Sequence, residues 1–168
     1  MLIISETERL ILRVLEPKDL DSVMNFWGND EVMKYCGGSS GNRELIGRAI
    51  NNYMNSQRKR GFSAYAVILK ETNEIIGACG YNYTQDGNEV ELIYHFSKQY
   101  WGKGYATEAG KACIEYAREN LHIDKIIASV DPKHYSSRKV LEKLGFEYID
   151  MRWFEDTKQN EPYFELHI

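Results

Sequence analysis

The sequence lacks the marks of a membrane or secreted protein. No segment reaches the ~18 consecutive apolar residues that a membrane-spanning helix needs. The first residues carry acids where a signal peptide has a basic start followed by a long apolar run. We therefore expect a cytoplasmic protein with no membrane partner. No linker, internal repeat or low-complexity stretch divides the 168 residues, which predicts a single domain over residues 1–168.

Cysteine and histidine are few and scattered. Cys36, Cys79 and Cys113 include no Cys-x-x-Cys pair, so neither a disulfide framework nor a zinc site is indicated, and small buried hydrophobes are their expected roles. The four histidines show no short-range ligand spacing, so no metal is expected. These histidines are His95, His122, His134 and His167.

Basic residues show no excess. The net charge of −4 argues against a nucleic-acid partner, which would require a basic stripe on the surface. The one compact basic run, residues 58–60, comes at the end of an expected helix, where cations interact favourably with the helix dipole. A solvated helix terminus is therefore the preferred interpretation of this run.

Hydrophobic periodicity predicts an α/β domain with a mixed sheet and about four helices. Helices are expected after Pro17, over residues 45–60, after the glycine-rich segment at 102–104, and from a cap at Ser136 or Ser137 onward. Strands are expected at residues 7–14, 63–69, 75–83, 89–96, 125–130, 146–155 and 161–167.

The connections predict how the strands pair. Short links favour an antiparallel meander over residues 63–96, with a tight primed turn at Asp86-Gly87. A strand, a helix and a further strand across residues 89–130 indicate a parallel crossover, so pairing is expected to change from antiparallel to parallel at the glycine-rich segment. Pro162 places the last strand near an edge or marks its start. Such an edge can pair with a second subunit, and both a monomer and a homodimer are open.

The glycine-rich segment is the most informative part of the chain. Residues 99–107, Gln-Tyr-Trp-Gly-Lys-Gly-Tyr-Ala-Thr, link an expected strand to an expected helix. Gly102 and Gly104 let the backbone approach an anion, and the first N–H groups of the helix have no partner inside it, so the segment is a candidate pyrophosphate cradle. Glycine follows Lys103, which excludes an NTPase phosphate loop, and Thr107 stands where a dinucleotide fingerprint needs a small residue. Taken alone, a glycine turn that binds nothing is the alternative.

Three motifs carry a family resemblance. The pattern Gln-x-x-Gly-x-Gly at residues 99–104 resembles the coenzyme A loop of the GCN5-related N-acetyltransferases, the GNAT family. Residues 128–146, which end in Glu-Lys-Leu-Gly-Phe, resemble the second signature of that family. Residues 7–13 and 29–33 resemble its branch that includes the ribosomal-protein N-terminal acetyltransferases. The resemblance covers nearly the whole chain and implies a GNAT-like acyl-CoA acyltransferase fold. It also implies acetyl-CoA as co-substrate and a primary amine, in a small molecule or at a protein N-terminus, as acceptor.

The resemblance further implies which residues contact coenzyme A. The strand at 89–96 is expected to splay from its neighbour at residues 94–96, leaving backbone groups free for the pantetheine arm. A backbone N–H near Ile93 or Tyr94 is expected to stabilise the oxyanion. Lys98, Lys103 and Arg138 are candidates for contacting the adenine and 3′-phosphate. The expected coenzyme-binding residues are Tyr94, His95, Phe96, Gln99, Trp101, Gly102, Lys103, Gly104, Tyr105, Ala106, Thr107, His134, Ser137 and Arg138.

Two positions depart from the family pattern. His134 stands where this branch usually has Asn. Leu141 stands where many members have a Tyr that protonates the departing thiolate, which turns attention to Ser137. Ser137 is interpreted either as this acid or only as a helix cap.

The chemistry requires a base, because a Lys-like amine with a pKa around 10.4 is protonated at neutral pH. Alternation along residues 89–96 places Glu89 and Glu91 on one face of the strand. Glu91 corresponds to the acidic residue of the branch pattern Glu-x-Gly-Tyr and is the preferred general base, with Glu89 second. Two solvated carboxylates on an exposed strand face are the alternative.

Two other functions fit the same residues. A non-catalytic module that binds or senses acetyl-CoA would need the intact loop and no base. A structural subunit would bind its partner through aromatic residues, for which Trp27, Tyr35 and Trp153 are the candidates.

Overall fold

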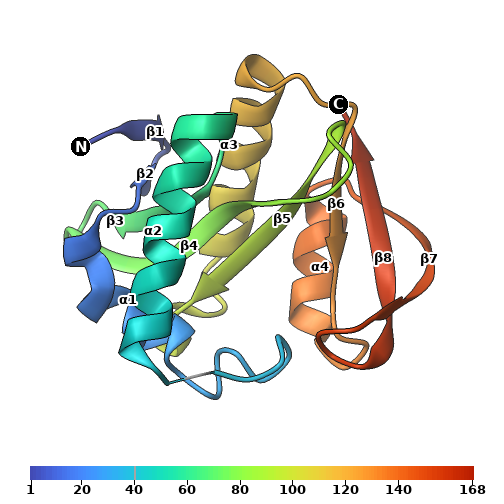
Figure 1. The fold of residues 1–168 in the computed structure, drawn as a ribbon, viewed down its shortest axis with the longest axis horizontal. Coiled ribbons are helices and arrows are strands. Elements are labelled where there is room, and N and C mark those ends of the chain that lie inside the picture. The colour runs from blue at the N-terminus through green and yellow to red at the C-terminus, as the bar shows by residue number, and fades with distance from the viewer. Residues whose placement is uncertain (40) are drawn as a thin grey trace.

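The computed structural model describes residues 1–39 and 41–168. Over these residues the chain forms one eight-stranded sheet and four α-helices, with 3₁₀ turns at Pro17–Asp19 and Lys98–Tyr100 (Figure 1). In chain order the other elements are β1 (Ile3–Glu6), β2 (Leu10–Val14), α1 (Leu20–Trp27), α2 (Arg43–Arg60), β3 (Ala64–Leu69), β4 (Glu74–Tyr83), β5 (Glu89–Phe96), α3 (Tyr105–Asn120), β6 (Lys125–Ser129), α4 (Tyr135–Lys143), β7 (Glu147–Phe154) and β8 (Gln159–His167).

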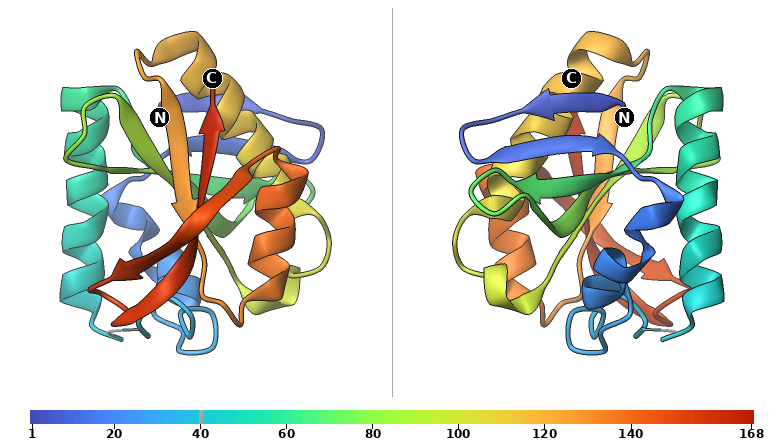
Figure 2. Two further views of the ribbon diagram at one scale, coloured as in Figure 1. Left: turned by 90° about the vertical axis from the view of Figure 1, so that its right-hand side faces the viewer. Right: turned by 90° about the vertical axis from the view of Figure 1, so that its left-hand side faces the viewer.

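The sheet is mixed, as expected. Its strands lie in the order β1-β2-β3-β4-β5-β6-β8-β7, and neighbouring strands are antiparallel except β5 and β6, which are parallel. Helices α1 and α2 cover one face of the sheet, and α3 and α4 cover the other (Figure 2). The predicted change of pairing direction at the glycine-rich segment is therefore confirmed.

Small residues let the helices approach the sheet closely. Under α1 and α2 the sheet presents the buried Ala64, Ala66 and Ala78, so Phe26 and Ile50 of the helices pack directly on the strands. Burying a large apolar side chain of this kind contributes about 1.5 to 3 kcal/mol. On the opposite face, α3 contacts the sheet through a stripe of small residues: Ala109, Ala112, Cys113 and Ala117.

Helix α2 begins and ends at residues whose chemistry explains the boundary. Asn42 Oδ1 accepts hydrogen bonds from the N–H groups of Glu44 at 2.9 Å and Leu45 at 3.2 Å, which satisfies two free donors of the first turn. Gly61 ends the helix in the left-handed conformation at φ +82°. The basic run at residues 58–60 forms the last turn, as predicted.

Strands β5 and β6 separate after a short ladder. β6 pairs with β5 from Glu89 to Glu91, whereas β5 remains paired with β4 as far as Phe96. In Figure 1 the two strands diverge beyond this ladder, toward the end of the molecule where α4 begins. The splay expected at residues 94–96 is therefore confirmed, and it already includes Leu92.

The last strand is not an edge, which corrects the prediction from Pro162. Strand β8 lies between β6 and β7, and Pro162 pairs with Met151 inside the sheet. The Pro162 carbonyl accepts a hydrogen bond from the N–H of Val130 at 3.4 Å, just beyond the end of β6. Proline is tolerated there because this bond uses its carbonyl and not the N–H that it lacks. The described edges of the sheet are β1 and β7, so a dimer edge in the last strand is not supported.

The strand expected at residues 7–14 covers only Leu10–Val14, and it is preceded by a strand that the sequence did not predict, β1 at Ile3–Glu6. β2 begins at Leu10, and the preceding residues instead contact α3. Thr7 Oγ1 donates to Glu108 Oε1 at 2.6 Å, and the Arg9 N–H donates to the same oxygen at 3.0 Å. These bonds to a helix carboxylate replace the strand ladder over this stretch.

The primed turn expected at Asp86-Gly87 is also wrong. Residues 84–88 join β4 to β5, and Gly87 is not among the glycines with positive φ, which a primed turn requires. Asp86 Oδ1 instead accepts the N–H of Asn88 at 2.9 Å, an Asx turn that a longer connection accommodates.

Two of the three cysteines are buried, as expected. Cys79 and Cys113 lie in the core with their Sγ atoms 3.7 Å apart, but Cys36 is exposed, which corrects the prediction for that residue. Among the described residues, no helix is both long enough and apolar enough to cross a membrane.

Candidate active site

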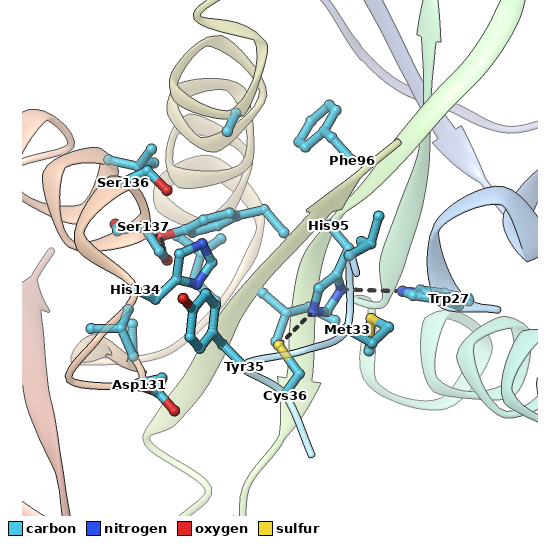
Figure 3. Close-up of a pocket in the computed structure, with 18 of the residues that line it drawn as sticks. Trp27, Met33, Tyr35, Cys36, His95, Phe96, Asp131, His134, Ser136 and Ser137 are labelled. Atoms are coloured by element: carbon cyan, nitrogen blue, oxygen red, sulfur yellow. Dashed lines mark hydrogen bonds between the residues drawn. The ribbon is translucent and has the colours of Figure 1, made fainter. Parts of the chain in front are cut away.

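The splay between β5 and β6 opens into a cavity of about 940 Å³. The residues that line it come from the ends of α1, β4, β5 and β6, from α2, from residues 31–38, from the glycine-rich loop with the start of α3, from α4, and from the β7–β8 turn with the start of β8. The sheet places these segments together although they are far apart in sequence. Figure 3 shows the central part of this cavity.

The glycine-rich loop has the shape of an anion cradle. Gly102 and Gly104 have φ values of +74° and +83°, a left-handed conformation that only glycine adopts readily. A Cβ added at Gly102 would meet no heavy atom within 4 Å, so the loop faces open space. Gly104 is the N-cap of α3 and no side chain caps this helix, so its first N–H groups are available to an anion. These features fit the pyrophosphate of coenzyme A.

Arg9 holds the loop against α3. Its Nη1 donates to the Lys103 carbonyl at 2.9 Å, its Nε donates to Glu108 Oε2 at 2.7 Å, and the guanidinium lies 4.4 Å from the centre of the Tyr105 ring. Sequence reasoning missed this role, because nothing in the motif near residue 9 indicates a contact with a loop almost a hundred residues later.

Most of the predicted coenzyme-binding residues line the cavity. Those that do are Tyr94, His95, Phe96, Trp101, Gly102, Gly104, Tyr105, Ala106, Thr107, His134 and Ser137.

Three predicted residues are not among the described lining residues, namely Gln99, Lys103 and Arg138. Arg138 turns toward β7 and β8, where its guanidinium lies 5.4 Å from the centre of the Tyr148 ring. Lys98 is engaged as well, in an ion pair with Glu31 at 2.7 Å.

Two lysines that sequence reasoning overlooked line the cavity instead. Lys139 and Lys143 belong to α4 and are the described ammonium groups among the lining residues. They are one helical turn apart, so they lie on the same side of the helix. They place positive charge at the wall formed by α4.

The end of β5 directs backbone groups into the splay. The Ser97 N–H donates to the Ile76 carbonyl of β4 at 3.0 Å. Because backbone groups alternate sides along a strand, those of Phe96 and Tyr94 point away from β4, toward the opening. Trp101 Nε1 donates to the Phe96 carbonyl at 2.8 Å, so that acceptor is already used. The N–H and carbonyl of Tyr94 remain directed at the cavity.

Ser137 is not a helix cap. His134 occupies the N-cap position of α4 without a side-chain capping bond, and Ser137 lies inside the first turn with only 8% of its surface exposed. Its hydroxyl is 2.8 Å from the hydroxyl of Tyr94, which also lies 2.9 Å from the Ser137 carbonyl. Burial raises the pKa of Tyr94, although its bond to Ser137 opposes this, so the phenol stays protonated.

His134 meets an aromatic residue from a distant segment. The Tyr35 ring stacks on its imidazole with ring centres 4.7 Å apart, and Figure 3 shows the two side chains together between β5 and α4. Burial lowers the pKa of His134. An asparagine could not provide this stacking surface, which gives a physical reason for the departure from the family pattern.

His95 is held neutral on the other face of β5. Its Nδ1 lies 3.1 Å from Trp27 Nε1, and its Nε2 lies 3.5 Å from Cys36 Sγ (Figure 3). An indole N–H can only donate, so Nδ1 must be unprotonated and Nε2 carries the proton. Burial, followed by the charge of His134, lowers the pKa of His95 to about 4. His95 is therefore no free base, and it anchors the segment at residues 31–38 to β5.

Of the two candidate bases, Glu91 faces the cavity and Glu89 does not. Glu91 lines the cavity, its Oε1 lies 3.5 Å from Asn82 Nδ2, and burial raises its pKa. Glu89 is not among the described lining residues, and its Oε2 faces Lys125 Nζ at 3.6 Å. The geometry favours the first choice over the second.

Other lining residues carry chemistry that sequence reasoning did not find. They come from loops or from elements whose approach to β5 depends on the fold, so no local motif marks them. They are Trp27, Tyr53, Asn82, Asp131, Asp156, Thr157 and Glu161.

A family model for the acetyltransferase (GNAT) domain matches residues 9–147. The chain belongs to the GNAT family. It is 35% identical over 147 residues to p20, an uncharacterised N-acetyltransferase of Bacillus licheniformis, in a match that covers 84% of this chain and 80% of p20. The family and the fold expected from the three sequence motifs are thereby confirmed.

Solved structures place this GNAT chain in the same fold. An acetyltransferase (GNAT family) from Bacillus anthracis superposes with a TM-score of 0.85 at 26% identity, covering 99% of this chain and 98% of the other. The ribosomal-protein-S5-alanine acetyltransferase of Vibrio fischeri superposes with a TM-score of 0.82 at 17% identity, covering 97% and 95% of the two chains. The second likeness supports the fold alone.

Membership of the GNAT family makes the chain an acetyl-CoA-dependent N-acetyltransferase. Acetyl-CoA is therefore its co-substrate, and the glycine cradle and the free backbone of Tyr94 fit that molecule. Among the described residues, no group of three or more His, Cys, Asp or Glu side chains is arranged to hold a metal ion.

Proposed function

We propose that in this GNAT enzyme a primary amine attacks acetyl-CoA directly and becomes acetylated, with Glu91 as the general base. The observation that carries the proposal is the position of Glu91. Its carboxylate lines the cavity on the strand whose freed backbone end faces the same cavity, and burial raises its pKa. A carboxylate with a raised pKa is a stronger base at neutral pH.

The pantetheine arm is proposed to lie along the open end of β5. The ladder between β5 and β6 ends at Glu91, so the N–H and carbonyl of Tyr94 would form hydrogen bonds with the arm and not with β6. The pyrophosphate would rest on the N–H groups at the start of α3, and Lys139 and Lys143 would supply positive charge nearby. The Tyr94 N–H is the proposed donor to the thioester oxygen. One such donor is worth about 2.7 to 4 kcal/mol of barrier lowering.

Glu91 would remove the proton that keeps the acceptor from attacking. Proton transfer from an ammonium of pKa around 10.4 to a carboxylate is unfavourable unless the neutral amine reacts as soon as it forms. The base must therefore lie beside the thioester that the amine attacks. Asn82 holds the carboxylate in place through the 3.5 Å contact. Transfer through one water is compatible with this geometry.

Tyr94 and Ser137 are proposed to assist the departing thiolate. Their hydroxyls form a pair at 2.8 Å, and the raised pKa of Tyr94 keeps its proton available as a hydrogen-bond donor. A thiol with a pKa near 8.5 needs only modest help to leave, so a hydrogen bond or a relayed proton is enough. The tyrosine that the family pattern places at position 141 would thus be replaced by one from β5.

A thiol-release screen tests the proposal. Purified protein with acetyl-CoA would be offered a panel of small amines and N-terminal peptides, and free coenzyme A would be measured with a thiol reagent. We expect at least one amine to give release above the rate of hydrolysis. Tight binding of acetyl-CoA with no release for any amine would instead indicate the non-catalytic binding module.

A further inference from the structure

Four of the carboxylates that line the cavity make no ion pair with the described residues. They are Glu91, Asp131, Asp156 and Glu161. None of the four lies within 4.0 Å of a Lys, Arg or His nitrogen among the described residues. Glu161 is buried, Glu91 and Asp131 are half-buried, and Asp156 is exposed. A buried charge is ordinarily paired because removing an ion from water is costly, so Glu161 is the exception that needs explaining.

Glu161 is the most unusual of the four. Only 4% of its surface is exposed, although it lines the cavity. The amide of Gln159 donates to Glu161 Oε2 at 2.9 Å and to Asp131 Oδ2 at 2.8 Å, so one neutral group serves two carboxylates. Burial raises the pKa of Glu161, and the charges of Asp156 and Asp131 raise it further. The native fold holds this carboxyl where its charge is disfavoured.

Thr157 contributes a second polar group beside Glu161. Its hydroxyl oxygen is buried, and Thr157 lines the same cavity in the turn between β7 and β8. The Thr157 hydroxyl, like the Gln159 amide, opposes the rise in the pKa of Glu161. The groups that hold this carboxylate are neutral, so an ammonium ligand would supply the positive charge that they lack.

The four carboxylates converge on one region. Desolvation, followed by the charges of all four carboxylates, raises the pKa of the Cys36 thiol to about 11, so the four lie within electrostatic range of one side chain. The aromatic rings of Trp27 and Tyr53, stacked with centres 5.7 Å apart, line the same cavity. Aromatic faces and carboxylates together are the chemistry that recognises organic ammonium groups.

We propose that the acceptor is a small linear diamine. One amine would lie at Glu91 and react, while the second, as an ammonium, would bind Glu161 with Asp156 and Asp131. The assignment rests on the proposed function, whose acceptor it narrows. It also accounts for the lining of the cavity, which includes these four carboxylates as well as the two lysines of α4.

The segment over the cavity favours a slender ligand over a polypeptide. Tyr35 stacks on His134 of the α4 start at 4.7 Å, and Cys36 contacts His95 of β5 at 3.5 Å. The segment at residues 31–38 is thus attached to both sides of the cavity. A methylene chain passes beneath such a covering, whereas a peptide with side chains would have to displace it.

The test compares amines that differ only in the second charge. Thiol release would be measured with 1,6-diaminohexane and with n-heptylamine, whose chains are the same length. We expect kcat/KM to be at least about tenfold higher for the diamine, the factor that one charge-assisted contact supplies. Glu161→Gln should remove most of this preference, so that the kcat/KM values for the two amines come within about twofold of each other. Glu155→Gln is the matched control, because it removes one charge at a residue that does not line the cavity, and it should keep the preference.

The remaining outcomes also decide the proposal. Equal kcat/KM for the two amines in the wild-type enzyme would overturn it, as would a clear preference for a lysine-containing peptide over every diamine. If Glu161→Gln fails to fold, Asp156→Asn in the exposed turn serves instead, with the same expected loss of preference.

Failure of the catalytic proposal would be recognised separately. If no amine releases thiol, calorimetry of 1,6-diaminohexane against the wild-type protein saturated with coenzyme A still tests the diamine site. Binding that Glu161→Gln weakens at least about tenfold would support the site, and absence of binding would overturn it.

Discussion

The hydroxyl of Tyr94 lies 2.8 Å from the hydroxyl of Ser137, although 43 residues separate them in the chain. The contact joins the free end of β5 to the first turn of α4, across the splay where the coenzyme arm is proposed to lie. Ser137 therefore belongs to a pair that bridges the splay between β5 and α4.

This pair predicts similar defects for two mutants. Ser137→Ala and Tyr94→Phe each remove one hydroxyl, so kcat should fall by roughly tenfold or more in both, with a double mutant little worse than either single one. Steady-state kinetics with acetyl-CoA and an identified acceptor measures this. Ser136→Ala is the control, since its hydroxyl makes no described bond to Tyr94. Full activity in both single mutants would exclude the pair from thiolate departure.

Removal of the proposed base predicts a changed pH profile. Glu91→Gln should lower kcat by roughly 10²-fold or more at neutral pH and leave acetyl-CoA binding unchanged. The raised pKa of Glu91 means that the wild-type rate falls as pH drops through that value, because the carboxylate becomes protonated. The mutant should lose this limb and recover partly at high pH, where the amine deprotonates unaided. Glu89→Gln should behave like the wild type, and the reverse result would reassign the base.

The loop assignment predicts a specific loss of coenzyme binding. Gly104→Val forces a branched residue into φ +83° and places its Cβ 3.4 Å from Arg9 Nη2, so the dissociation constant for coenzyme A should rise at least about tenfold. Gly47→Val in α2 is the matched control, since a Cβ there meets nothing within 4 Å. Calorimetry on folded protein measures both, and wild-type affinity in the Gly104 mutant would contradict the loop assignment.

The buried ion pair between Arg13 and Asp19 predicts a large stability loss. The two side chains make bonds of 2.7 and 2.9 Å and are 7% and 4% exposed. Asp19→Ala leaves the arginine buried without its partner, so the free energy of unfolding should fall by about 3 to 5 kcal/mol. Asp21→Ala removes an exposed partner of Arg43 and should cost less than about 1 kcal/mol. Urea denaturation of both variants tests the difference.

Glu161 predicts a pH-dependent stabilisation on mutation. Its pKa is raised in the folded state, so the folded protein binds more protons than the unfolded chain, and its ionisation costs stability as pH rises. Glu161→Gln should therefore raise Tm relative to the wild type at pH 8, and the gain should disappear below the ordinary pKa of glutamate, about 4.3. Thermal denaturation across pH measures it. If the difference in Tm between the two proteins did not change with pH, ionisation of Glu161 would not destabilise the folded state.

Sequence patterns predicted local backbone conformation better than they predicted which elements lie side by side. Gly61 and Gly104 mark a helix end and a helix start because a positive φ is a property of the residue itself. The prediction of an edge strand from Pro162 was wrong, because a neighbouring strand can bond the proline carbonyl without needing an N–H. Whether it does so is decided by the position of β8 between β6 and β7. For Ser137 the sequence leaves two roles open, because a hydroxyl near a helix start can bond the backbone or a distant side chain.

The sequence by itself determined the family, the antiparallel-to-parallel sheet, the anion cradle and the two carboxylates on one face of β5, because each follows from motifs or alternation within a short stretch. Only the tertiary structure decided that Glu91 faces the cavity while Glu89 faces Lys125, and that Tyr94 reaches Ser137. It alone brought Glu161 and Thr157 to the cavity wall. These contacts join segments that are far apart in the chain. Whether the segments meet depends on how the sheet splays and the helices pack, which no short sequence pattern specifies.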